Sequence, residues 1–136
     1  MKRVLIIKNE ITEISKLVTF IETIGEELGL SPALVMSLNL ALEEAVSNII
    51  LYAYPKEFNQ DISIEAVKEN NALIFTITDT GVEFDPTKGG DVDITLTVED
   101  RPVGGLGIFL IKKIMNEVEY KRVDDMNVFT LKKLLE

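Results

Sequence analysis

Three short segments of this chain carry residue types that could bind a phosphorylated ligand. The first, EEAVSN, places Glu44 and Asn48 four residues apart, so on a helix both side chains lie on one face. An amide oxygen is a suitable ligand for Mg²⁺, and a glutamate one turn earlier can accept a proton from a hydroxyl or orient a water molecule. A solvated Glu–Asn pair on a surface helix is the alternative, and these residues alone leave both open.

The second segment, TITDTGVEFDP, ends an apolar run at Asp79 and continues to Gly81. A carboxylate at the end of a strand can accept a hydrogen bond from an exocyclic amine such as that of adenine. A glycine two residues later lets a flat ring lie against the backbone. The same residue types also suit an ordinary turn.

The third segment, RPVGGLGIFLIKK, places Gly105 and Gly107 where a helix begins, although glycine is a poor helix former. Exposed backbone N–H groups at the start of a helix favour anions, and phosphate is the commonest of these. A tight connection between a loop and a helix is the alternative. Arg101, just before the glycines, could also contact a phosphate, or it could be a solvated loop arginine.

Composition excludes several other kinds of site. The 136-residue chain has no histidine and no cysteine, so it can have no imidazole base, no thiolate metal ligand and no disulfide. The motif G-x-x-x-x-G-K-[ST] is absent, which excludes a P-loop NTPase. The GGLG segment also lacks the glycine spacing of a Rossmann site.

The charge balance bears on partners and on location. The net charge is −9, from 23 acidic and 14 basic residues. Such a surface repels nucleic acid and anionic membranes, so we expect neither as a direct partner. Soluble protein partners, or an anionic ligand bound together with a cation, are more consistent with it. The absence of cysteine suits a reducing cytoplasm, and we expect no stretch long enough to span a bilayer.

The first half of the chain must position Glu44 and Asn48. A run rich in β-branched residues predicts a strand over 3–8, with Asn9 as a candidate cap for the next helix. Apolar residues at three- and four-residue spacing predict that helix over 14–28, ending near Gly29. Ser31 as N-cap and Pro32 at the first position predict a second helix. We expect the second helix to run to about Tyr54, where Pro55 stops it.

The second half must position Asp79 and the glycines. Strand patterns predict one hairpin over 61–69 and 72–79, and a second over 117–123 and 127–135, with a helix between them. Together the elements predict one α+β domain over 1–136, a two-layer α/β sandwich whose mixed, mostly antiparallel sheet has three helices on one face. The long irregular segment before the last helix is of a length that usually has a function.

The order of the three segments resembles that of a known family. EEAVSNIILYAYP is similar to the N box of the GHKL ATPase superfamily, DTGVEFDP to its first glycine box, and GGLGIFLIKKIMNEVEY to its second. The resemblance covers roughly residues 10–134 and implies the Bergerat fold. The single-domain length, together with LALEEAVSNII and RPVGGLGIFLIKK, most resembles the anti-sigma-factor serine/threonine kinases.

This resemblance implies that ATP and Mg²⁺ are the cofactors and gives each matching residue a role toward them. Asn48 would hold Mg²⁺ against the triphosphate, Glu44 would be the catalytic base, Asp79 would bind the adenine amino group, Gly81 would make room for the ring, and Gly105 and Gly107 would offer backbone N–H groups to the phosphates. Residues 82–103 would form a lid over the nucleotide. One position departs from the pattern, because Glu83 stands where the first box usually has its second glycine. This places in doubt how tightly ATP binds or how fast it turns over.

The same resemblance implies the activity and the partners. An anti-sigma-factor kinase would phosphorylate a serine or threonine of an antagonist protein and would sequester a sigma factor, thereby regulating transcription. A non-catalytic, nucleotide-dependent binding regulator is one alternative. A detached ATPase-like domain of a sensor kinase system, acting on a histidine of another chain, is a second. A homodimer formed through an exposed sheet edge would add a copy of this chain to the partners.

Overall fold

A computed structural model describes residues 1–54, 59–89 and 105–135 of the chain. Within these ranges the elements are β1 (Lys2–Lys8), η1 (Ile11–Glu13), α1 (Ile14–Leu28), α2 (Pro32–Asn48), η2 (Ile49–Ala53), β2 (Asp61–Glu69), β3 (Ala72–Asp79), η3 (Pro86–Gly89), α3 (Gly105–Ile114), β4 (Glu117–Val123) and β5 (Met126–Leu134). This order of strands and helices confirms the order expected from the sequence.

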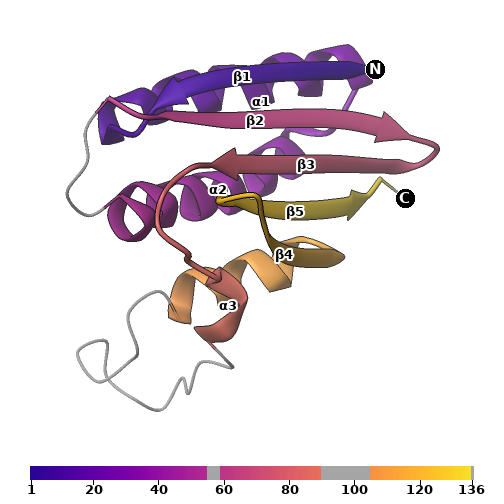
Figure 1. Ribbon diagram of the computed structural model, residues 1–136. Coiled ribbons are helices and arrows are strands. Elements are labelled where there is room, and N and C mark those ends of the chain that lie inside the picture. Colours follow the sequence, from indigo (N-terminus) through magenta and orange to yellow (C-terminus); the bar gives the residue numbers. More distant parts are fainter. Residues whose placement is uncertain (55–58, 90–104, 136) are drawn as a thin grey trace.

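The five strands form one sheet in the order β1-β2-β3-β5-β4, and each of these four pairings is antiparallel. Along β3 and β5 the side chains alternate between a buried row and a partly exposed row, as a sheet covered on one face requires. Figure 1 shows α1 and α2 behind the sheet, with α3 beside the edge formed by β4. The predicted two-layer α+β sandwich is therefore confirmed, with an entirely antiparallel sheet in the described part of the chain.

The first helix forms for the reasons that its sequence indicates. Its apolar residues Leu17, Ile21 and Ile24 recur on one face and are buried in the core. Gly29 ends the helix with a φ of 65°, a conformation that glycine adopts without steric cost. Asn9 is not a helix cap, contrary to our expectation: its side-chain oxygen accepts a 2.8 Å hydrogen bond from the backbone N–H of Gln60 and so ties β1 to β2.

The second helix is the central helix of the helical layer and packs against both α1 and α3. Ser31 caps it as predicted, accepting a 3.1 Å hydrogen bond from the backbone N–H of Leu34. After Asn48 the helix widens into one π turn, η2, a feature that is frequent at functional sites. The predicted end near Tyr54 is confirmed, while Pro55 lies outside the described residues.

The apolar character of this helix bears on the expectation that no segment could span a membrane. By length and composition alone, the 22-residue segment Pro32–Ala53 is long and apolar enough to do so, with a mean hydropathy of 1.5 in its 18-residue window. That expectation was therefore wrong as stated. The core helix of a globular domain passes the same test, and here Leu38, Leu42 and Val46 pack into the core beneath the sheet.

The two hairpins turn where the sequence predicts. Asn70 has a φ of 54° between β2 and β3, and Asp124 and Asp125 have φ values of 48° and 63° between β4 and β5. Asparagine and aspartate tolerate this left-handed conformation better than most residues, which explains their presence there. Of the expected lid over 82–103, the structure describes 82–89, whereas 90–103 lie outside the described residues.

Candidate functional site

Glu44 and Asn48 meet the beginning of α3 at Gly107. A methyl group added at Gly107 would lie 3.0 Å from the Asn48 Nδ2 atom and 3.1 Å from the Glu44 Oε2 atom. Asn48 is only 8% exposed although it is polar, and Glu44 is partly buried one turn before it. The structure thus brings these three predicted site residues together and rules out the alternative of a fully solvated Glu–Asn pair.

The packing of α3 on α2 explains this meeting. Ile108 and Ile111 of α3 are buried in the core and fix the helix against its neighbour. Because glycine has no side chain, the first turn of α3 approaches the polar residues of α2 closely at Gly107. Backbone N–H groups at the start of a helix lack partners within that helix, so this end of α3 can receive an anion beside a carboxylate and an amide.

Asp79 lies at the end of β3 and is 2% exposed. Its Oδ1 atom accepts two hydrogen bonds of 2.9 Å, one from the backbone N–H of Gly81 and one from the Asn127 amide. Its Oδ2 atom is buried and accepts no hydrogen bond from any residue that the structure describes. A buried acceptor without a donor is costly, so this oxygen is suited to receive an N–H group of a ligand.

Burial raises the pKa of the Asp79 carboxyl above its ordinary value. The hydrogen bonds from Asn127 and Gly81 and the nearby positive charge of Arg122 act in the opposite direction without cancelling this effect. The folded protein therefore carries a carboxylate whose charge is poorly solvated. A hydrogen-bond donor brought by a ligand would stabilise that charge.

Asn127 on β5 is a site residue that sequence reasoning missed. It faces Asp79 across the sheet, and its amide also donates a 2.8 Å hydrogen bond to the carbonyl of Val82. Its oxygen accepts hydrogen bonds from the Tyr120 hydroxyl at 2.6 Å, from Arg122 Nη1 at 3.2 Å and from the Phe84 backbone at 3.2 Å. One buried amide thus connects Asp79 with the loop after it.

Other contacts in this network keep the loop after Asp79 in place. Arg122 donates a 2.8 Å hydrogen bond to the carbonyl of Gly81. Burial, and then the negative charge of Glu83, raise the pKa of Tyr120, so its hydroxyl stays protonated at neutral pH and can donate to Asn127. The strand alternation did hold a signal for Asn127, because it places this polar residue on the same buried side as Phe129.

The loop after Asp79 also packs on the end of the helix that carries Asn48. The backbone N–H of Val82 donates a 2.9 Å hydrogen bond to the Ala53 carbonyl, and a methyl group at Gly81 would overlap that same carbonyl. Tyr54 accepts a 2.8 Å hydrogen bond from the backbone N–H of Thr80. Through these contacts Asp79 and Gly81 are held against the turn that comes after Asn48.

The remaining predicted site residues are placed less completely. Gly105 is the first residue of α3, as the sequence indicated. Arg101 lies outside the described residues. Glu83 has an exposed side chain on the loop after Asp79. The described residues contain no cluster of three or more carboxylates that could hold a metal ion. A divalent cation there would therefore depend on few protein ligands, such as the Asn48 amide, and on the ligand's own oxygens.

Comparison with known proteins gives two findings. The chain matches the histidine kinase-like ATPase domain over residues 7–133. It is also 28% identical over 113 residues to proteins named serine-protein kinase RsbW, from Bacillus cereus (strain AH820), Bacillus anthracis and Bacillus thuringiensis (strain Al Hakam). These alignments cover 80% of this chain and 70% of each relative. Since the domain match spans nearly the whole sequence and the fold agrees with it, the chain belongs to the histidine kinase-like ATPase family.

Proposed function

We propose that the protein binds ATP with Mg²⁺ and transfers the γ-phosphoryl group to a serine or threonine hydroxyl of a partner protein. The observation that carries this proposal is the meeting of Glu44, Asn48 and Gly107 at the start of α3. A carboxylate and an amide there lie close to the beginning of a helix, where backbone N–H groups lack partners within that helix. The similarity to proteins named serine-protein kinases supports the choice of acceptor.

The residues present fit ATP at both ends of the molecule. The buried Asp79 Oδ2 atom lacks a donor among the described residues, and the adenine amino group would supply one. Gly81, which offers no side chain, leaves room for the ring beside that carboxylate. Gly105 and Gly107 begin α3, whose backbone N–H groups would bind the phosphates. The Asn48 amide oxygen would be a ligand of Mg²⁺.

When bound, Mg·ATP supplies the phosphoryl group and neutralises much of its charge. The contribution of the chain would be positioning and one proton transfer. Glu44 would accept the proton of the attacking hydroxyl as the new phosphate ester forms and ADP leaves. Asn48 would hold the cation so that the reacting groups stay in line. Asp79 and Asn127 would keep the base, and thereby the whole nucleotide, in register with Glu44.

The partners follow from the resemblance to anti-sigma-factor kinases. The acceptor would be an antagonist protein, and the unphosphorylated antagonist would compete with a sigma factor for this chain. The net charge of −9 agrees with protein partners rather than direct contact with nucleic acid. We place the protein in the cytoplasm, where transcription takes place and where a chain without cysteine is suited to reducing conditions.

Two measurements test this proposal. Isothermal titration with ATP should give binding that requires Mg²⁺ and that Asn48→Ala weakens by about 100-fold, whereas Asn71→Ala in the β2–β3 turn leaves it unchanged.

Incubation with Mg·ATP and a candidate antagonist should give acid-stable phosphoserine or phosphothreonine. Glu44→Gln should abolish this product without loss of ATP binding, and Glu119→Gln on β4 should have no effect. ATP binding without any phosphorylated acceptor would refute the kinase activity.

Glu83 favours a second candidate, a regulator that binds its partner in a nucleotide-dependent way without turnover. Its exposed carboxylate lies soon after Asp79 in the chain and would repel the phosphates of a nucleotide nearby. In that case wild type and Glu44→Gln should capture a sigma factor equally and release it equally when the antagonist is added. Unequal release would instead support the kinase.

A further inference from the structure

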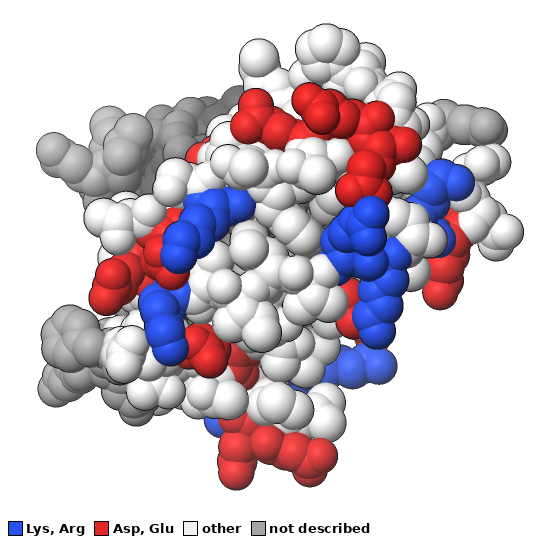
Figure 2. Space-filling model, turned by 90° about the horizontal axis from the view of Figure 1, so that it is seen from above, with Lys and Arg blue, Asp and Glu red and all other residues white. Residues whose placement is uncertain are grey.

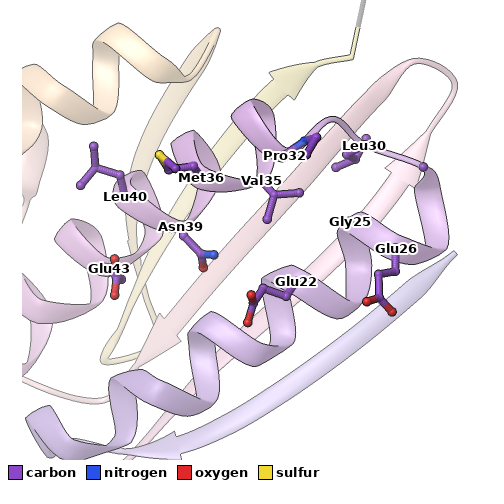
Figure 3. A pocket seen from close by; sticks show the side chains of 11 residues that line it. Glu22, Gly25, Glu26, Leu30, Pro32, Val35, Met36, Asn39, Leu40 and Glu43 are labelled. Carbon is purple, nitrogen blue, oxygen red and sulfur yellow. The ribbon is translucent and has the colours of Figure 1, made fainter.

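A hollow lies on the outer surface of the helical layer, between the C-terminal half of α1 and the N-terminal half of α2. Its volume is about 800 Å³. Figure 3 shows Val35 and Asn39 pointing from α2 toward α1, with Glu22 and Glu26 on the facing helix. None of the residues proposed to bind nucleotide lines this hollow, which we call the α1–α2 groove.

The apolar residues of the groove are unusually accessible. Met36 is 73% exposed and Leu40 is 43% exposed, and both line the groove from α2. Val35, Leu30 and Pro32 continue this apolar lining into the hollow. The walls of the hollow are thus mainly apolar, which suits the apolar face of a partner.

The two helices are close together at the base of the groove. A methyl group at Gly25 of α1 would lie 2.5 Å from Val35 Cγ2, so only glycine permits this approach. Because α1 and α2 also pack on the core through Leu17, Ile21 and Leu38, the groove is part of the folded framework. A partner would therefore meet a surface that is already formed, which reduces the entropic cost of binding.

The margin of the groove is acidic and lacks counter-charges. Glu22, Glu26 and Glu43 line it. None of the three forms a salt bridge with another residue in the part of the chain that the structure describes. In contrast, Glu27 pairs with Arg3 and Glu13 pairs with Lys16. Figure 2, which looks onto the β1 edge, shows charges of both signs around the centre of the face and a run of acidic side chains toward its upper margin.

Asn39 independently indicates that the groove suits a ligand that carries a hydrogen-bond donor. Its Oδ1 atom is buried yet accepts no hydrogen bond from the described residues. Figure 3 shows the amide lying between the two helices, beside Glu22. An N–H or ammonium group entering the groove would satisfy this oxygen and would meet the carboxylates around it.

We propose that the α1–α2 groove binds an amphipathic helix of a partner protein, with apolar side chains on its inner face and lysine or arginine on its flanks. The apolar residues would pack on Val35, Met36 and Leu40, as in other complexes where a helix fills a hydrophobic groove. The basic residues would pair with Glu22, Glu26 and Glu43. A second copy of this chain would bring the same acidic margin against itself, and an anionic membrane would be repelled. The groove is therefore selective for a basic helix.

The test uses two synthetic helical peptides of about 18 residues with one shared leucine face, one flanked by lysine and one by glutamate. Each is titrated into the ¹⁵N-labelled full chain. We expect the lysine peptide to shift the signals of Gly25, Val35 and the Asn39 side-chain amide, and to bind at least about tenfold more tightly than the glutamate peptide. The triple variant Glu22→Gln/Glu26→Gln/Glu43→Gln should remove this preference. The matched triple Glu10→Gln/Glu117→Gln/Glu119→Gln, on other surfaces, should retain it.

Several outcomes would overturn the proposal. Equal binding of the two peptides, shifts confined to another surface, or no binding of either peptide at millimolar concentration would each do so. A dimer in sedimentation that Met36→Gln dissociates would assign the groove to a second copy of the chain. Binding to phosphatidylglycerol vesicles that Met36→Gln abolishes would assign it to a membrane surface.

Discussion

The two ends of α2 depart from the usual distribution of polar and apolar residues in opposite directions. At its C-terminal end the polar residue Asn48 is buried, and the buried Asp79 lies against the next turn of the chain. At its N-terminal end the apolar residues Met36 and Leu40 are exposed. A buried carboxylate lowers stability, and accessible apolar surface lowers solubility. The comparison suggests that one helix serves two recognition surfaces of different chemistry.

The spacing along the helix keeps these surfaces apart. Twelve residues separate Met36 from Asn48, about 18 Å along an α-helix, although the groove margin extends as far as Glu43, the residue before Glu44. We expect a helix packed on Val35 and Met36 to lie clear of the proposed nucleotide. Mutations at one end should leave binding at the other end nearly unchanged, and a mutation that altered both would break the comparison.

The largest effect is expected at Gly81, on the polar side of the comparison. A methyl group there would overlap the Ala53 carbonyl and lie 2.8 Å from the Ala53 Cβ atom. Because a backbone carbonyl at the end of a packed helix cannot move aside, Gly81→Ala should lower the free energy of unfolding by about 3 kcal/mol. Urea unfolding measures this. Gly29→Ala is the control: its added methyl meets no atom within 4 Å, so only its φ of 65° is costly, about 1 kcal/mol.

Asp79→Asn should separate stability from function at the same end. The adenine amino group would lose its charged acceptor, so the affinity for ATP should fall by about 30-fold, equivalent to about 2 kcal/mol. The unfolding free energy at neutral pH should not fall, because a buried carboxylate is replaced by a neutral amide of the same shape. Isothermal titration and urea unfolding measure the two quantities. A loss of stability as large as the loss of affinity would mean that Asp79 is structural.

The pH dependence of stability gives Asp79 a second readout. Burial raises its pKa in the folded chain above the ordinary value of 3.8. Between the unfolded and folded pKa values the folded protein holds more protons, so this residue's contribution to stability is lost as the pH rises through that window. Asparagine does not titrate. The free energy of unfolding of Asp79→Asn should therefore fall less than that of wild type as the pH rises from 3.8 toward neutral.

Gly25→Ala, like Gly81→Ala, adds one methyl group, but it does so beside the α1–α2 groove, at the N-terminal end of α2. The added methyl group would lie 2.5 Å from Val35 Cγ2, a side-chain atom rather than a backbone carbonyl. Val35 is only partly buried, so its side chain can shift outward, and we expect a loss of only about 1.5 kcal/mol in urea unfolding. The affinity for ATP should stay within twofold of wild type. A large loss of affinity would show that the two ends of α2 are coupled.

The sequence predicted those features that depend on neighbouring residues. Ser31 and Pro32 specify the start of α2, Gly29 specifies the end of α1, and the apolar spacing of Leu17, Ile21 and Ile24 specifies the buried face. Each of these acts within one or two turns of a helix. The placement of Glu44 and Asn48 on one helical face is of the same kind.

The features that were missed or wrongly predicted depend on contacts between distant segments. Asn9 is a residue type that often caps helices, but its side-chain oxygen instead accepts a hydrogen bond from the backbone N–H of Gln60, just before β2. Asn127 acquires its role only because β5 pairs with β3 and places it opposite Asp79. The α1–α2 groove was hidden for the same reason, since the sequence alone does not reveal how closely Gly25 lets α1 approach Val35.

The smallest effect should come from Met36, and it bears directly on the apolar end of the comparison. Met36 is 73% exposed, so Met36→Gln removes little buried area and should change the free energy of unfolding by less than about 0.5 kcal/mol. Leu38, two residues along the same helix, is 0% exposed, and Leu38→Ala should cost about 3 kcal/mol. Urea unfolding of both variants gives this contrast. A loss above about 1 kcal/mol for Met36→Gln would mean that Met36 is part of the core. The exposed apolar surface would then be smaller than the structure indicates, and α2 would have one recognition surface rather than two.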